Sequence, residues 1–285
     1  MATVEELKRI ASQVRRDIVR MVHAVNSGHP GGSLGCTEYM VALYFEVMKH
    51  NKNFSMDAVG EDVFYLSNGH ISPVWYSVLA HAGYFDVSEL STFRKLNSRL
   101  QGHPTPHEHI PGVRMASGSL GQGMSNAIGT ALTKKLNKDD SIVYSLHGDG
   151  EFQEGQIWEA LMFAPHHKVD NLICTMDMNN AQIDGPVEVV LNHYDIKAKL
   201  LAFNWEVLAV KQGNDMEAVV NVLKEAKART GKGKPVFIIM HTQMGYGVDF
   251  MQGGHKWHGI APNDEQLANA LGQLEQTIGD YTNAG

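Results

Sequence analysis

Cysteine and basic charge, which mark several classes of protein, are both scarce in this sequence. Its two cysteines, Cys36 and Cys174, are too few and too far apart for a disulfide framework or a metal-binding knuckle. The formal net charge is −7, with 24 basic residues against 31 acidic ones, so the basic surface that nucleic-acid binding requires is missing. We therefore expect no nucleic-acid partner and a reducing compartment, the cytoplasm.

Long apolar runs are absent as well. No uninterrupted run approaches the roughly 20 residues that a membrane-spanning helix needs. The first residues lack the basic and apolar regions of a signal peptide. Repeats, low-complexity tracts and a clear linker are also missing. The 285 residues, 43% of them hydrophobic, therefore predict one globular domain over residues 1–285 with no membrane association.

The most informative stretch is a glycine-rich turn that separates two apolar segments. Residues 141–146 (SIVYSL) suit a buried parallel strand, and residues 156–164 (QIWEALMFA) read as a helix. Between them lies GDGEFQEG, residues 148–155. A strand, glycine-rich turn and helix present free backbone N–H groups at a positive helix end, which suits a diphosphate. Asp149 in this turn is suited to hold the divalent metal ion that neutralises a diphosphate.

A second polar position follows one crossover later. Residues 172–176 (LICTM) predict another buried strand, and Asn179 lies 30 residues after Asp149 (179 − 149 = 30), the length of one strand–helix–strand unit. This spacing places both side chains at the carboxyl ends of neighbouring parallel strands, where open α/β sheets bind ligands. A lone Gly-Asp-Gly is a common turn. Its pairing with Asn179 predicts a diphosphate and metal site.

The rest of the chain alternates strands with helices, which predicts an α/β fold with a mainly parallel sheet and helices on both faces. Residues 26–35 are too rich in glycine and proline to continue the first helix, and we expect a loop there. The loop at 105–111 is long enough to suggest a functional role. Further strands are expected at 63–66, 204–210 and 235–241, and further helices at 4–25, 38–48, 73–82, 124–135, 215–229 and 264–278.

Among the 15 histidines, four stand out in glycine-containing motifs, namely His29, His70, His103 and His258. Glycine lets the backbone approach a ligand closely, while imidazole can donate a hydrogen bond or carry a proton near neutral pH. Taken singly, each would more often be a loop residue with a local hydrogen bond. Zinc is disfavoured, because none of the four has a second ligand at metal spacing, and the closer pairs His166–His167 and His255/His258 lack cysteine or carboxylate neighbours.

Taken in order, the motifs resemble the N-terminal domain of transketolases. They are SGHPG at 27–31, SNGH at 67–70, GHP at 102–104, GSLGQG at 118–123, GDGEFQEG at 148–155, DMNNAQIDG at 177–185 and HKWHG at 255–259. The likeness extends from about Arg15 to Pro262. It implies a thiamine diphosphate-binding fold of the diphosphate type. It also implies a transferase that moves a two-carbon ketol unit from a ketose, expected to be phosphorylated, to an aldose.

The resemblance also implies a role for each matching residue. Mg²⁺ or Ca²⁺ would be held by Asp149, Asn179 and the backbone carbonyl of Ala181. Thiamine diphosphate would be bound by His70, Gly118, Leu120, Asp149, Gly150, Glu154, Asn179 and His258. The catalytic set would be His29, His70, His103, His258 and Glu154, the last in a hydrogen-bond network that reaches the next subunit. Ser119 and Met178 depart from the family's usual proline and aspartate, and residues 105–109 also differ, which leaves substrate contacts there open.

A partner chain is implied too. Transketolase chains are more than twice this length, and their pyrimidine-type and C-terminal domains supply the glutamate that activates the cofactor and the arginines that hold the sugar phosphate. We expect a separate C-terminal subunit to supply both, in an α2β2 heterotetramer. Otherwise the lone chain would have to use Glu151 or Asp184 as the activating carboxylate.

Two other functions stay open from the sequence. The first is a subunit of another thiamine diphosphate enzyme, of the 2-oxo acid or acetoin dehydrogenase type, or a deoxyxylulose phosphate synthase. These enzymes share the GDG core but not the whole set of histidine motifs. The second is a non-catalytic regulator that binds metal and diphosphate. A regulator would have no use for the four histidines.

Overall fold

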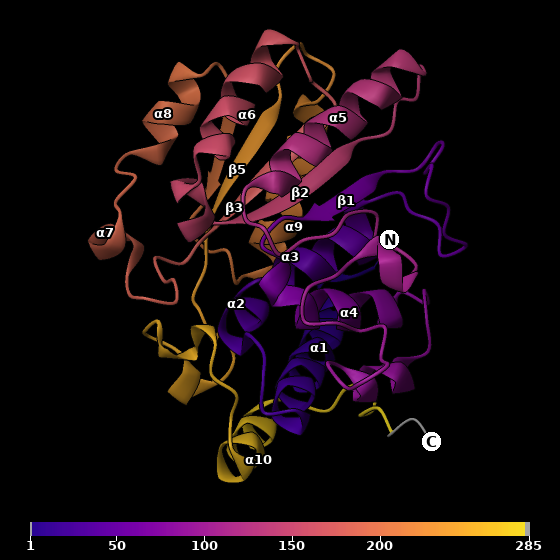
Figure 1. Cartoon of the computed structure of the whole chain (residues 1–285), viewed down its shortest axis with the longest axis vertical. Coiled ribbons are helices and arrows are strands. Elements are labelled where there is room, and N and C mark those ends of the chain that lie inside the picture. Colours follow the sequence, from indigo (N-terminus) through magenta and orange to yellow (C-terminus); the bar gives the residue numbers. More distant parts are fainter. Residues whose placement is uncertain (1, 283–285) are drawn as a thin grey trace.

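A five-stranded parallel sheet in the order β1-β2-β3-β5-β4 organises the molecule (Figure 1). The structure is a computed structural model, and it describes residues 2–282. The strands are β1 (Val63–Leu66), β2 (Val143–Gly148), β3 (Leu172–Met178), β4 (Glu206–Val210) and β5 (Val236–His241). Because all the strands are parallel, their carboxyl ends meet at one edge of the sheet. The predicted α/β fold with a parallel sheet is confirmed.

Helices cover both faces of this sheet, as predicted. The helices are α1 (Val4–Ala24), α2 (Pro30–Gly35), α3 (Thr37–Ala42), α4 (Ser72–His81), α5 (Gln122–Leu136), α6 (Gly155–His166), α7 (Val187–Val190), α8 (Ile196–Ala202), α9 (Met216–Arg229) and α10 (Asp264–Gln273). In Figure 1, α5 and α6 lie in front of the strands and α9 lies behind them. Among residues 2–282, no helix combines the length and apolarity needed to cross a membrane.

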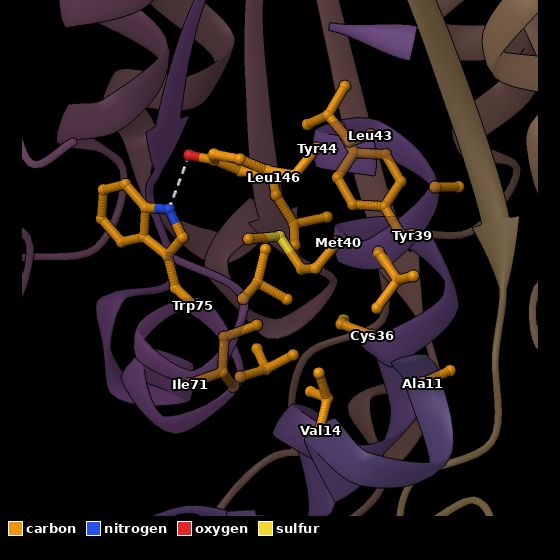
Figure 2. Close-up of a cluster of buried hydrophobic side chains, with 14 of the residues drawn as sticks. Ala11, Val14, Cys36, Tyr39, Met40, Leu43, Tyr44, Ile71, Trp75 and Leu146 are labelled. Carbon is orange, nitrogen blue, oxygen red and sulfur yellow. Dashed lines mark hydrogen bonds between the residues drawn. The ribbon is translucent and has the colours of Figure 1, made fainter. Parts of the chain in front are cut away.

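The sheet separates two apolar cores, because successive side chains of a strand point to opposite faces. In β1, Phe64 and Leu66 belong to the core built with α1, α3, α4 and α9, whereas Val63 and Tyr65 belong to the core built with α5, α6 and α8. Figure 2 shows part of the first core. There the buried indole of Trp75 donates a hydrogen bond of 2.7 Å to the hydroxyl of Tyr44, so its polar atom is satisfied.

The prediction of a loop over residues 26–35 is wrong for its second half, which forms α2. Pro30 occupies the first turn of this helix, where no backbone N–H is needed. Glycine is needed at position 31 because α2 packs closely against the segment around Trp257. A Cβ on Gly31 would lie 2.7 Å from the carbonyl oxygen of Trp257. Gly31 therefore lets α2 lie directly against the segment that carries His258.

The last predicted helix, 264–278, ends earlier, at Gln273. Arg16 of α1 donates hydrogen bonds to the carbonyls of Leu271 (2.9 Å) and Leu274 (2.7 Å), which satisfies the end of α10 and turns the chain along α1. The sequence also missed α7 and α8, which are too short to show a clear helical period.

Candidate active site

Asp149 lies directly after β2 and faces the end of β3. Its backbone N–H donates to the carbonyl of Asp177 (3.2 Å). Its carboxylate accepts hydrogen bonds from the backbone N–H groups of Gly150 (2.8 Å) and Asn180 (2.5 Å). The predicted pairing of the Gly-Asp-Gly turn with the Asn179–Asn180 segment is therefore present, across neighbouring parallel strands.

The environment of Asp149 favours a bound cation. Asp149 and Asp177 are both buried, and among residues 2–282 no basic side chain forms an ion pair with either. Burial, together with the neighbouring Asp177, raises the pKa of Asp149 to about 7. Two buried carboxylates without a counter-charge fit a site whose positive charge is supplied by a bound metal ion.

Asn179 follows β3 and is held in one orientation. Its Nδ2 donates to Asp177 (2.8 Å), while its Oδ1 accepts the N–H of Ala181 (2.9 Å) and keeps a second lone pair. Thr242, directly after β5, donates a hydrogen bond to the same Asp177. A hollow of about 270 Å³ adjoins Asn179 and Ala181, with Thr242 and His255 also in its lining. These neutral oxygens beside Asp149 suit a hard cation such as Mg²⁺ or Ca²⁺.

Glu151, two residues past Asp149, has a structural role that the sequence did not indicate. Its side chain is buried. It accepts hydrogen bonds from the hydroxyl of Ser67 and from the backbone N–H groups of Gly121 (2.7 Å) and Gly148 (3.1 Å). The ring of His147 lies 3.6 Å away. Burial alone would raise the pKa of Glu151, but His147 and the hydrogen bonds from Ser67 and Gly121 lower it below its ordinary value.

Glu151 thus joins the loops that follow β1 and β2 to the start of α5. No local sequence signal separates this glutamate from an exposed acidic residue in a turn. The suggestion that Glu151 could serve as the activating carboxylate is wrong, because both of its oxygens already accept hydrogen bonds inside the protein.

Three of the four predicted histidines form a compact triangle. The ring centroid of His29 lies 5.0 Å from that of His70 and 5.6 Å from that of His258, and the His70 and His258 centroids are 5.1 Å apart. Each ring comes from a different segment, just before α2, after β1 and near the end of the chain. The fourth, His103, is exposed and lies against Gly118, where a Cβ would be 3.4 Å from its ring.

The surroundings of these three histidine rings favour their neutral form. Burial, followed by the neighbouring His258, Arg94 and His103, lowers the pKa of His29 to about 4. Burial also lowers the pKa of His70 well below its ordinary value. Nδ1 of His29 and Nδ1 of His258 are buried without a hydrogen-bond partner among the described residues. Uncharged rings with unpaired nitrogens can donate or accept a hydrogen bond, or move a proton, once a ligand is present.

The other predicted residues lie around this centre. Gly118 is exposed, and Leu120 is partly buried, one residue before the left-handed Gly121 (φ +86°) that begins α5. Glu154 is exposed at the N-terminus of α6, where its side chain makes no capping hydrogen bond. A role for Glu154 through a second subunit stays a prediction.

A protein-ligated zinc centre finds no support in the described part of the chain. No three His, Cys, Asp or Glu side chains among residues 2–282 gather closely enough to hold a metal ion. The rings of His166 and His167 are adjacent, with centroids 4.8 Å apart, but they lie at the far end of α6. The Asp149 site is of another kind, with one carboxylate and neutral oxygens.

Sequence comparison finds relatives along nearly the whole chain. The profile of a family described as "Transketolase, thiamine diphosphate binding domain" matches residues 6–277. An apulose-4-phosphate transketolase subunit of Phocaeicola vulgatus is 34% identical over 275 residues, which are 96% of this chain and 96% of that protein. The 6-deoxy-6-sulfo-D-fructose transketolase subunit of a Clostridium species is 34% identical over 274 residues, covering 95% of this chain and 97% of the relative.

Solved structures show the same likeness. The transketolase from Leishmania mexicana superposes with a TM-score of 0.89 at 34% identity, covering 99% of this chain and 43% of that chain. The transketolase from Campylobacter jejuni gives a TM-score of 0.88, also at 34% identity, covering 99% of this chain and 44% of that one. The chain therefore spans less than half the length of the solved transketolases that it matches.

Proposed function

Since the chain belongs to the transketolase family, as its thiamine diphosphate-binding domain, we propose that it is the diphosphate-binding subunit of a two-chain transketolase. The proposed enzyme depends on a divalent metal and transfers a two-carbon ketol unit from a phosphorylated ketose to an aldose. One observation carries the proposal. The Asp149–Asn179 pair and the histidine triangle meet at the same carboxyl edge of the sheet, around α2 and the loops after β1, β2 and β3.

The residues present fit the cofactor. Asp149, the amide oxygen of Asn179 and the carbonyl of Ala181 would hold Mg²⁺ or Ca²⁺, while the N–H of Gly150 would donate to the diphosphate. The backbone around Gly118 and Leu120 would contact the aminopyrimidine. When bound, thiamine diphosphate supplies the electron sink that ketol transfer requires.

The histidines would handle substrate oxygens and protons. His29, His70 and His258 come from three segments, so a sugar between them would be held by several hydrogen bonds at once. Because burial keeps the imidazoles neutral, each ring can donate to a hydroxyl at one nitrogen and accept a proton at the other. His103, exposed beside Gly118, would contact the part of the substrate that extends toward solvent.

A partner chain would complete the site. The names of two relatives that match along nearly their whole length describe each of them as one subunit of a transketolase. We propose that a second chain supplies the pyrimidine-type domain, with its activating glutamate, and the phosphate-binding arginines. Two such sites related by a two-fold axis give an α2β2 assembly. The sugars in those two names carry a phosphate or a sulfo group, which supports an anionic sugar as the ketose donor.

Reconstitution tests this function. The purified chain, a candidate partner and an equimolar mixture would each be assayed for ketol transfer between phosphorylated sugars, with thiamine diphosphate and Mg²⁺ present. We expect turnover from the mixture alone and an α2β2 mass by light scattering. Robust turnover by the lone chain would overturn the two-chain arrangement. A stable complex that binds the cofactor but transfers no ketol unit from any phosphorylated ketose would overturn the proposed reaction.

A further inference from the structure

Arg94 occupies an unusual position between two of the loops that carry histidines. Its Nη1 donates a hydrogen bond of 2.6 Å to the hydroxyl of Ser27, two residues before His29. On its other side the guanidinium lies against Gly102, where a Cβ would be 2.6 Å from the guanidinium carbon. Residue 102 immediately precedes His103. A single side chain therefore links the segments that position these two imidazoles.

The backbone is shaped to place this side chain. Arg94 has a left-handed φ of +56°, which costs energy in a residue with a Cβ, and its N–H donates to the carbonyl of Leu100 (2.8 Å). This bond closes residues 94–100 into a compact loop that begins at Arg94. Strain of this kind persists only where the surrounding structure enforces it.

The charge of Arg94 has no counter-charge in the described part of the chain. Among residues 2–282, no carboxylate forms an ion pair with Arg94, and its Nε is buried without a hydrogen-bond partner. Arg99 on the same loop differs, because its guanidinium pairs with Glu89. Burial lowers the pKa of Arg94 below its ordinary value, but an arginine still stays charged at neutral pH.

We propose that Arg94 is a positioning residue that joins the His29 and His103 loops and places an uncompensated positive charge beside both imidazoles. The catalytic consequence rests on the function proposed above, whereas the electrostatic effect belongs to this chain alone.

The charge acts on both rings in the same direction. The charged and titratable groups that face His29 are His70, His258, His103 and Arg94. Partial burial of the His103 ring comes first, and the charge of Arg94 second, in lowering the pKa of His103 below its ordinary value. A nearby cation disfavours protonation, so Arg94 helps to keep both imidazoles neutral and able to accept a proton.

Histidine titration by NMR tests the charge directly, on the full chain with and without its partner. In Arg94→Gln we expect the titration midpoints of His103 and His29 to move to higher pH. The midpoint of His103 should move further, because burial and His258 have a larger effect than Arg94 on the pKa of His29. Arg94→Lys keeps the charge and should leave both midpoints near the wild-type values. Arg99→Gln, the same change at a paired arginine on the same loop, is the matched control and should shift neither.

The outcomes separate the possibilities. Unchanged midpoints in Arg94→Gln would overturn the proposal, and so would an equal rise in Arg94→Lys, since that would indicate lost packing. Should Arg94→Gln fail to fold, Ser27→Ala frees the guanidinium from its partner and must give a smaller rise at His29. In the assembled enzyme, the acidic limb of the pH profile of kcat/KM should shift to higher pH in Arg94→Gln. Midpoints that move while this limb stays fixed would count against the proposed function and leave the electrostatic role standing.

Discussion

Asp149 and Asp177 form a pair of buried carboxylates at the end of neighbouring strands, and no described basic residue pairs with them. Removing such carboxylates from water is costly unless a cation accompanies them. At the scale of single residues, this pair is the strongest indication in the molecule that a metal ion belongs in the fold.

Asp149→Ala tests that role. We expect metal-dependent binding of thiamine diphosphate by the assembled enzyme to weaken at least about 100-fold, because the loss of one partner of a buried charge pair typically costs about 3–5 kcal/mol. Titration calorimetry at fixed Mg²⁺ measures the affinity, and Asp184→Ala, an exposed acidic residue nearby, is the control. Wild-type affinity in Asp149→Ala would remove this residue from the metal site.

Variants of the histidines test whether these side chains act in catalysis. His103→Ala and His258→Ala should each lower kcat/KM by about 10²–10⁴-fold, the usual contribution of a general acid or base, and cofactor affinity should stay near wild type in His103→Ala. His107→Ala, an exposed histidine on the same loop as His103, is the control for surface effects. If steady-state kinetics match wild type in both variants, these residues are ordinary loop histidines.

At the scale of elements, the turn after β2 is braced by Glu151. The carboxylate accepts the N–H of Gly121 with one oxygen and that of Gly148 with the other, so it ties the start of α5 to the end of β2. Ser67, which also donates to Glu151, accepts the N–H of Gly123 (3.1 Å). The loops proposed to surround the cofactor are thus fixed relative to one another by a single buried side chain.

Glu151→Gln keeps the size of the side chain but turns one acceptor into a donor that faces a backbone N–H. We expect a loss of about 1–3 kcal/mol in the free energy of unfolding, the cost of an unsatisfied buried polar group, together with weaker thiamine diphosphate binding. Denaturant unfolding and calorimetry measure the two effects.

Glu38→Gln is the matched control, because Glu38 is equally buried, pairs with Arg15 and lies outside the cofactor loops. It should destabilise the chain without changing cofactor affinity. Equal losses of cofactor affinity in the two variants would mean that Glu151 supports only the fold.

At the scale of the whole molecule, buried neutral histidines make stability depend on pH. The pKa of His29 falls from an ordinary value of 6.5 to about 4 on folding, so the unfolded chain binds this proton more readily. The contribution of His29 to stability is therefore full above about pH 6.5 and is lost as the pH falls toward about 4. Asp149 acts in the opposite sense, because its pKa rises from 3.8 to about 7 and the fold favours its protonated form.

Comparison of wild type with His29→Gln isolates the histidine. The difference in Tm between the two proteins should shrink between pH 7 and pH 5, because glutamine cannot take up the proton. Thermal unfolding followed by circular dichroism in matched buffers measures it. A difference that stays constant over this range would mean that His29 does not titrate in the way its burial implies.

Local sequence patterns predict the parallel sheet and the positions of Asp149 and Asn179 after adjacent strands. An apolar run of strand length precedes the Gly-Asp-Gly turn, and another precedes Asn179. Because Asp149 and Asn179 are 30 residues apart (179 − 149 = 30), these runs were enough to predict adjacent parallel strands. These features are local, since strand period, turn chemistry and crossover length are each written within a few tens of residues.

Contacts between residues far apart in the sequence are apparent only in the folded chain. Ser67 and Glu151, 84 residues apart in sequence, are hydrogen-bonded, and Arg94 lies between the Ser27 and Gly102 segments. The neighbouring sequence does not mark Glu151 as buried or Arg94 as unpaired. The sequence around an acidic or basic residue in a turn is the same whether the folded chain buries the residue or leaves it exposed. The glycines of α2 misled the sequence prediction for the same reason. Gly31, Gly32 and Gly35 pack closely against residues 257, 71 and 243, and these contacts exist only once the distant segments are in place.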